Sequence, residues 1–360
     1  MIERYEDPAV AEWFSPGATY AVWAMVEMCC LEVGGYATPD PDQIFGQAKG
    51  LASDAFTQHV RDRERETRHE FVAFLQVLRQ ALTDLGYEQA HEHLHEGLTS
   101  SDVQDTTLAL QTMCASAHVL LKVGALANAL SGLISRTKTI TQIGRTHGQY
   151  AVPRPFAHRW DVSRGMLDRQ AVRLRTALAG ISIGKLSGPV GTDPIKHAQA
   201  VFGELGLSSA PSTQIVPRDG LAHWAHVLAG LTTICEDIAL QVRLLSQSDI
   251  DEVYEGQQVG SSAMPHKRHN PAMSENICGL ARMARSRANE LELGVVQWGD
   301  RDLAHSSVER VSIPDLLHLV CTALTRTADL VLELAVDEQS IRQNNIDAQT
   351  RADQATRLYK

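Results

Sequence analysis

One apolar seam in the second half of the chain constrains the fold more than any other feature of the sequence. Between Leu221 and Leu245, apolar residues recur at alternating intervals of three and four positions. This spacing keeps them on one face of an α-helix for more than three heptads, which is typical of a long helix packed in a bundle. Because sustained alternation with a period of two is scarce elsewhere, the sequence predicts an all-α fold. The seam consists of Leu221, Trp224, Leu228, Leu231, Cys235, Ile238, Val242 and Leu245.

The same period predicts further long helices with three interruptions between them. A helix is expected from about Val103 to Ile134, behind a cluster of good N-capping residues, and others near 156–180, 272–293 and 312–335. The interruptions are 144–153, expected as a turn between helices, the glycine-rich turn 184–192, and the loop 255–271. Loops on a rigid helical frame often carry chemistry, so candidate functional residues are expected there.

The bulk composition narrows the classes of function. With 33 Lys and Arg against 43 Asp and Glu, the formal net charge is -10, and an acidic surface argues against broad nucleic-acid or membrane binding. No run approaches the roughly 18 apolar residues that a membrane span requires, and the N-terminus lacks the apolar core of a secretory signal. The six cysteines include no CxxC pair, which favours reduced thiols in a cytoplasmic protein.

The stretch 260–271 is the strongest local candidate for a functional segment. It reads GSSAMPHKRHNP, so small residues provide mobility and backbone donors, while Lys267, Arg268 and His269 supply positive charge. Pro271 could begin the next helix, since a missing N–H costs nothing there, and an anion near that start would meet free backbone N–H groups. From these residues alone, an anion-binding flexible loop and a solvated basic surface loop are equally supported.

This stretch resembles the GSSxMPxKxNP signature of the fumarase/aspartase superfamily, and its MPHKR variant is most similar to the adenylosuccinate lyase and carboxymuconate cycloisomerase branches. Other pieces resemble adenylosuccinate lyases in the same order over nearly the whole chain. The resemblance implies an N-terminal helical domain at 1–98, a central long-helix bundle at 99–337 that forms a tetramer core, and a reduced C-terminal segment at 338–360. The pieces are MIERY at 1–5, TRHE at 67–70, HEGLTSSD at 95–102, GRTHG at 144–148, STQ at 212–214 and RDLAHSSVER at 301–310.

The resemblance further implies an anti β-elimination that releases fumarate from adenylosuccinate. By position, Ser261 is the base that removes the proton beside a carboxylate, and His147 is the acid that protonates the departing nitrogen. Histidine suits this role because imidazole titrates near the working pH. Serine is a poor base unless a closing loop brings N–H groups and a cation to its oxygen, and Lys267 matches that cation. Ser262 and Asn270 match ligands of the substrate carboxylate.

The other implied residues bind the two ends of the substrate, at sites that the family builds where three subunits of a homotetramer meet. A nucleotide phosphate needs charge-assisted donors, and a pair four residues apart on one helix shares a face. The family requires no metal and no cofactor. The phosphate side matches Arg4, Tyr5, Arg301, Ser306 and Arg310; the succinyl side matches Thr99, Ser100 and Gln214; and Arg68, His69, Glu70 and His95 complete the substrate-binding set.

The chain departs from the family pattern in three places. His269 looks like a one-residue insertion that shifts Asn270 against the usual frame, and Glu70 stands where the family usually has Asp. Family members also continue for roughly another helical domain beyond the position of Asp337. These departures leave open a superfamily lyase acting on a modified succinyl-purine or another succinyl-amine, and a non-catalytic oligomeric paralogue. A metal site at His91, His93 and His95 is disfavoured, because no Cys or carboxylate stands at ligand spacing.

Overall fold

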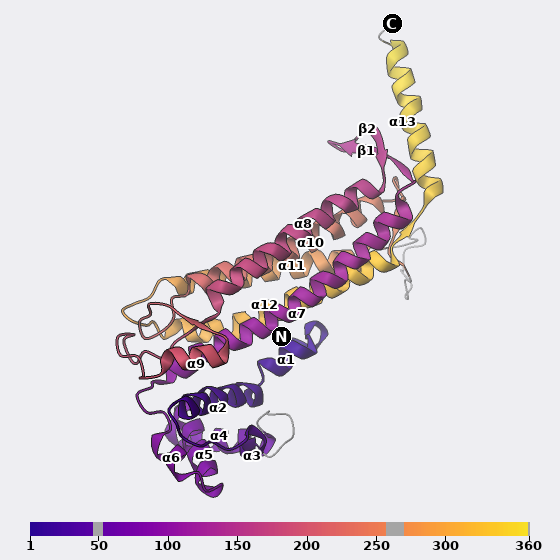
Figure 1. Cartoon of the computed structure of the whole chain (residues 1–360). Coiled ribbons are helices and arrows are strands. Elements are labelled where there is room, and N and C mark those ends of the chain that lie inside the picture. The colour runs from indigo at the N-terminus through magenta and orange to yellow at the C-terminus, as the bar shows by residue number, and fades with distance from the viewer. Residues whose placement is uncertain (46–52, 257–269, 359–360) are drawn as a thin grey trace. The chain divides into compact units, whose positions relative to one another are not determined.

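Long helices dominate the computed structural model, which describes residues 1–45, 53–256 and 270–358 (Figure 1). The all-α prediction is confirmed, since the strands are short and only pair in twos. The apolar seam lies on α10, and all of its residues except the last are buried. The long helices are α7 (Ser100–Thr137), α8 (Ala157–Ile181), α10 (Asp219–Leu245), α11 (Ala272–Glu292), α12 (Ala304–Glu333) and α13 (Glu338–Leu358).

The chain divides into two units, each assembled from three segments. Unit 1 contains 1–118, 175–225 and 289–314, and unit 2 contains 119–174, 226–288 and 315–360. The domain boundaries expected from the sequence, after 98 and after 337, remain a prediction.

Unit 1 contains an aromatic core between α2 and α5. Trp23 of α2 lies edge-on to Phe71 and Phe74 of α5, with ring centroids 4.9 and 5.2 Å apart. All three side chains are buried, and burying such a ring stabilises the fold by roughly 1.5–3 kcal/mol. The elements outside the long helices are η1 (Glu3–Tyr5), α1 (Pro8–Trp13), α2 (Pro16–Val33), α3 (Pro41–Phe45), α4 (Asp54–Thr67), α5 (Glu70–Asp84), α6 (Glu88–His93), α9 (Ala198–Leu205), η2 (Leu293–Val295) and the parallel strands β3 (Ile183–Gly184) and β4 (Ser208–Ser209).

Unit 2 contains a β-hairpin where we predicted a turn between helices, so that prediction was wrong. Strands β1 (Thr141–Thr146) and β2 (Gln149–Pro155) pair antiparallel, with a register shift after Ile143. The two residues that connect them both have positive φ, 55° at His147 and 71° at Gly148. Two such residues form the tight turn whose twist matches paired strands. A second antiparallel pair joins β5 (Val253–Tyr254) to β6 (Ala335–Val336), and α13 contacts β1.

Helix α7 is the one helix of the described ranges that meets the length and composition of a membrane span, a test that core helices of globular proteins also pass. Within unit 1 it carries Asp102, Asp105 and Thr106, all buried and all hydrogen-bonded to other segments of the unit. Buried polar groups with protein partners are expected in a core helix, because lipid supplies no such partners.

Candidate active site

A cavity of about 340 Å³ lies wholly within unit 1 and collects several residues singled out in the sequence. Glu70 of α5, Arg301 just before α12, and Ser306 and Arg310 in the first turns of α12 line it. Ser306 and Arg310 share the cavity-facing side of one helix, as their spacing of four predicted. Trp23 contributes apolar surface. A pocket with apolar walls and a few convergent polar groups is typical of a small-molecule site.

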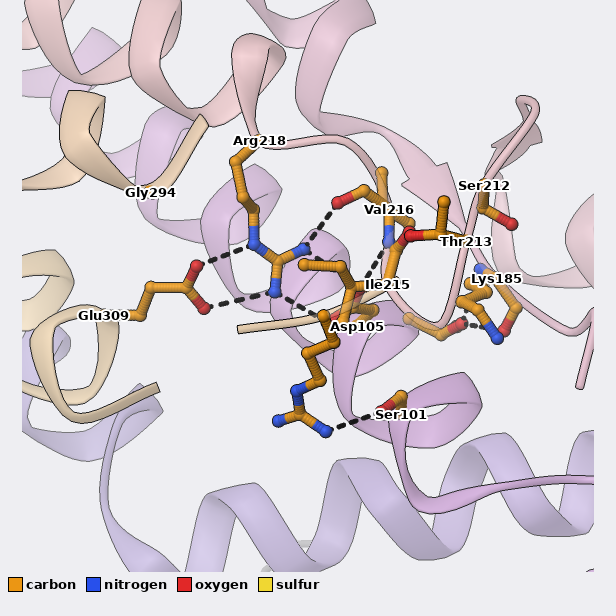
Figure 2. A network of polar contacts seen from close by, with 12 residues as sticks. Ser101, Asp105, Lys185, Ser212, Thr213, Ile215, Val216, Arg218, Gly294 and Glu309 are labelled. Carbon is orange, nitrogen blue, oxygen red and sulfur yellow. Dashed lines mark hydrogen bonds and ion pairs between the residues drawn. The ribbon is translucent and has the colours of Figure 1, made fainter. Parts of the chain in front are cut away.

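A buried guanidinium braces this cavity. Figure 2 shows Arg218 between Glu309 of α12 and Asp105 of α7. Its Nε and Nη2 donate to the Glu309 carboxylate at 2.6 and 3.1 Å, and its Nη1 and Nη2 donate to Asp105 at 2.9 and 3.0 Å. Nη1 also donates to the Val216 carbonyl at 2.9 Å, while the Val216 N–H donates to Asp105 at 2.7 Å. The network therefore ties the segment before α10 to two other helices.

Opposing effects act on the pKa of Arg218. Burial alone would lower it, but the charge and hydrogen bonds of Asp105, followed by those of Glu309, raise it above its ordinary value. The side chain is thus a permanent cation neutralised by two carboxylates. It is the structural brace of the cavity and leaves anion recognition to the other arginines.

Arg301 is the lining arginine whose partners, among the described residues, are hydroxyl groups. Its Nη1 donates to Ser101 Oγ at 2.9 Å and its Nη2 donates to Ser306 Oγ at 3.0 Å. These bonds hold the guanidinium in place without neutralising it, and three of its five N–H donors remain. A fixed and uncompensated guanidinium is suited to bind a carboxylate or a phosphate.

Glu70 links Arg310 to the apolar core. Arg310 Nη1 lies 3.2 Å from one carboxylate oxygen of Glu70, and the Tyr20 hydroxyl donates to the other oxygen at 3.0 Å. Burial raises the pKa of Tyr20 well above its usual range, and the charge and hydrogen bond of Glu70 raise it further. Tyr20 therefore stays protonated and keeps donating to Glu70. Because the Arg310 side chain is 71% exposed, a single weak ion pair leaves it available to a ligand.

The start of α7 is held by a buried ion pair. Thr99 donates to Asp102 Oδ2 through its N–H and its hydroxyl, both at 2.7 Å. Asp102 Oδ1 accepts from Lys185 Nζ at 2.7 Å and from the Ser187 N–H at 2.8 Å. Both charged side chains of the pair are fully buried. The glycine-rich turn 184–192 thus fixes Thr99 through Asp102, and Ser100 follows it as the first residue of α7. Both residues match the succinyl ligands of the family.

His95 is also held in a defined orientation. Its backbone φ is 65°, its ring lies 5.2 Å from that of Phe71, and its Nδ1 lies 2.6 Å from a carboxylate oxygen of Glu27. The His95 N–H also donates to Glu27 at 3.1 Å. Because a carboxylate only accepts, Nδ1 carries the proton and Nε2 remains for other contacts. Glu27 was missed in the sequence, although it is an acid enclosed by the apolar residues of 21–31 in α2.

The remaining candidates lie outside this cavity. Arg4 and Tyr5 belong to η1, Arg68 ends α4 in the left-handed region with φ 53°, and His69 caps α5. Gln214 is half-buried in the segment before α10. His147, exposed at the tip of the hairpin, and Asn270, just before α11, belong to unit 2. Ser261, Ser262 and Lys267 lie outside the described residues.

The histidine triplet at 91–95 does not share a partner. His91 Nδ1 lies 2.8 Å from Thr83 Oγ1, and His93 Nδ1 lies 2.6 Å from Glu96. Since His95 bonds to Glu27, each ring has its own protein partner.

A family of lyases matches residues 48–285 of this chain. The adenylosuccinate lyase of Synechocystis sp. is 35% identical over 352 residues, which are 96% of this chain and 80% of that protein. The adenylosuccinate lyase of Bacillus subtilis is 33% identical over the same shares, and that of Archaeoglobus fulgidus is 31% identical over 95% of this chain and 77% of the relative.

Solved structures agree on the fold. A fumarate lyase from Mesorhizobium sp. BNC1 has a TM-score of 0.80 at 22% identity, covering 96% of this chain and 79% of that one. The 3-carboxy-cis,cis-muconate lactonizing enzyme of Pseudomonas putida has a TM-score of 0.83 at 24% identity, covering 94% and 78%. With the family matched over most of its length, the chain belongs to the lyases of the fumarase/aspartase superfamily and is homologous to adenylosuccinate lyases.

Proposed function

We propose that this chain is a fumarate-releasing C–N lyase that converts adenylosuccinate to AMP and fumarate. The succinyl-carboxamide ribotide of purine synthesis, which carries the same leaving group, is included in the proposal. The observation that carries it is the placement of Arg301, which lines the unit 1 cavity beside Ser306 and Arg310 and has hydroxyl partners there. The adenylosuccinate lyases among its relatives support the choice of substrate.

In this proposal Ser261 and His147 carry out an anti elimination. Ser261 Oγ takes the proton from the carbon beside a succinyl carboxylate, and the electron pair of that C–H bond becomes the new C=C bond of fumarate. The electrons of the breaking C–N bond go to nitrogen, which receives a proton from His147. Lys267 stabilises the serine oxygen, and Ser262 and Asn270 bind the carboxylate on which charge develops.

The proposal assigns the binding roles to described residues. Arg301, Ser306 and Arg310, with Arg4 and Tyr5, bind the phosphate, while Thr99, Ser100 and Gln214 bind the succinyl group. His69 supports the acid or the phosphate side, His95 orients the acid or holds substrate, and Arg68 and Glu70 complete the binding set. Asp105 and Glu309 act by holding Arg218, which fixes the helices that carry the binding residues.

We further propose a cytoplasmic homotetramer in which neighbouring subunits complete each active site. Lyases of this superfamily are typically homotetramers with active sites shared between subunits, which supports this proposal. Several large apolar side chains of the long helices are exposed, including Leu121, Val172 and Leu332 at 60–73% of their surface. Exposed apolar side chains on long helices are expected where helices of other subunits pack. Light scattering of the purified chain tests the assembly.

The decisive experiment follows the purine absorbance of adenylosuccinate with the wild type, Ser261→Ala and His147→Asn. Both variants are expected to lose turnover by at least about a hundred-fold. Asn is chosen at position 147 because it tolerates a positive φ. The matched controls are Ser307→Ala and His158→Ala, two exposed residues on α12 and α8, which are expected to keep full activity.

Three results would redirect the proposal. Fumarate release from another succinyl-amine, with adenylosuccinate left intact, would assign a different superfamily substrate. Nucleotide binding without turnover in the wild type would indicate a non-catalytic paralogue. Full activity of folded Ser261→Ala would remove the serine from the role of base.

A further inference from the structure

A second cavity, of about 470 Å³, lies wholly within unit 2, and its lining residues have no assigned role in the elimination proposed above. The β1–β2 hairpin, the end of α10, the segment 247–250 and α13 form its walls. Three arginines reach it from three different elements: Arg145 of β1, Arg154 of β2 and Arg351 of α13. Their convergence makes the cavity a candidate site for an anion.

Arg145 is the arginine that the protein itself neutralises. Its Nη2 lies 2.8 Å from Glu252 Oε1, and the Glu252 side chain is fully buried. Glu252 also accepts a hydrogen bond from Asn344 Nδ2 of α13 at 2.8 Å. Glu252 therefore joins the hairpin, through Arg145, to α13, through Asn344, at the wall of the cavity.

Arg351 has a different environment. Its guanidinium lies 5.3 Å from the ring centroid of Tyr150, and that of Arg145 lies 5.5 Å from the same centroid. The tyrosine ring therefore holds two cations close together, because each is attracted to its π-system. Among the described residues Arg351 has no carboxylate partner, so its charge remains available.

Arg154 has a polar group that the described protein leaves unsatisfied. Its Nε is buried without a hydrogen-bond partner. The side chain passes over Gly144, where an added Cβ would stand 3.7 Å from its Cδ and 3.8 Å from its Nε. Burial lowers the pKa of Arg154, the nearby charges of Arg159 and Arg145 lower it further, and Glu252 opposes them. A buried donor without a partner costs free energy. Within the described ranges no hydrogen bond occupies the Nη atoms of Arg154 either, so they remain for a ligand in the cavity.

The net charge of the groups around the cavity favours binding of an anion. Three arginines face two acids, Glu252 and the exposed Asp249, which leaves a net charge of +1. Guanidinium groups match the oxygens of phosphate in a fork geometry, with charge-assisted hydrogen bonds. We propose that this cavity binds a phosphate group through Arg154 and Arg351, either as free phosphate or as part of a phosphorylated metabolite.

The size of the cavity favours the larger of these two ligands. A volume of about 470 Å³ falls in the range of roughly 300–1,000 Å³ typical of sites for small organic molecules, and exceeds the need of one phosphate ion. The proposed anion site does not depend on the substrate of the unit 1 cavity. The proposal of this site and the proposed lyase activity are therefore tested independently of each other.

Calorimetric titration of the full chain with inorganic phosphate, and separately with ATP, tests the site at constant ionic strength. Arg351→Ala and Arg154→Gln are expected to weaken phosphate binding by roughly ten-fold or more. Arg342→Ala is the matched control, because it removes the same charge from α13 at an exposed residue that does not line the cavity. It is expected to bind like the wild type.

The outcomes separate the two cavities and the two ligand sources. Binding of ATP with the same dependence on Arg351, but without binding of free phosphate, assigns the site to a phosphorylated metabolite. Phosphate binding that Arg301→Gln abolishes and that Arg351→Ala leaves unchanged would place the anion in the unit 1 cavity and overturn the inference. Absence of binding of both ligands to the folded wild type would overturn it as well.

Discussion

Removing the cation of the Asp105–Arg218–Glu309 network is the sharpest test of how the unit 1 cavity is held. Arg218→Met keeps most of the side-chain volume and deletes four hydrogen bonds to carboxylates and one to a carbonyl. It leaves two carboxylates, with 7% and 16% of their side-chain surface exposed, without a counter-charge. Breaking a buried ion pair on one side costs about 3–5 kcal/mol, because the remaining charge is desolvated.

That loss converts to a measurable shift in melting temperature. At roughly 2.1 cal/mol/K of unfolding entropy per residue, the 360 residues give roughly 0.8 kcal/mol/K, so Tm should fall by roughly 4–7 °C. The assay is calorimetry or circular dichroism on the purified protein. The triple variant Arg218→Met/Asp105→Asn/Glu309→Gln removes the stranded charges and should recover much of the loss.

Arg63→Met is the control for this measurement. Arg63 pairs with Glu66 at 3.1 Å on the surface, with 56% and 69% of the two side chains exposed, and such pairs contribute about 0–1 kcal/mol. Its Tm should lie within about 1 °C of the wild type. If folded Arg218→Met melted as close to the wild type as this control, the network would not be what holds the cavity together.

Three further predictions concern the hairpin, a helix contact and a buried thiol. His147→Asn should lose turnover without losing stability. His147→Val should also lower Tm, because a β-branched residue is strained at the φ of 55° found at this position. Equal Tm values for the two variants would contradict this prediction. Gly220→Ala should destabilise by about 1–3 kcal/mol or more in urea unfolding, since its Cβ would stand 2.0 Å from the Gly180 carbonyl oxygen. Gly203→Ala, which meets nothing within 4 Å inside α9, should instead stabilise by about 0.5–1 kcal/mol, and the opposite order would refute the packing argument. Burial raises the pKa of the Cys235 thiol from 9.0 to about 12, and a hydrogen bond with Thr327 opposes this rise only in part. Above pH 9 the folded state therefore keeps a proton that the unfolded state releases. The contribution of this thiol to the free energy of unfolding is complete below pH 9 and decreases by about 1.4 kcal/mol per pH unit above it. Between pH 9 and 11 the free energy of unfolding of Cys235→Ala should therefore fall less steeply than that of the wild type. Parallel slopes would contradict the assignment.

The sequence by itself determined the helices and part of the cavity. Leu221 to Val242 form a buried face on α10 because the period of an α-helix is a local property that apolar spacing reports directly. The same local rule placed Ser306 and Arg310 on one face of α12, and both line the cavity. The resemblance added Arg301 and Glu70, which the structure brings to that cavity as well.

Only the tertiary structure decided how these local pieces are held. Arg218 bonds to residues 113 and 91 positions away, and His95 bonds to Glu27 across 68 positions, so no spacing in the sequence marks either pair. The hairpin was missed for a related reason, since its strands are short and depend on cross-strand pairing and a two-residue turn at His147. Helical periodicity depends on residues that are neighbours along the chain. The partner of a buried charge depends instead on which distant segments the tertiary fold brings together, and local residue patterns do not encode this.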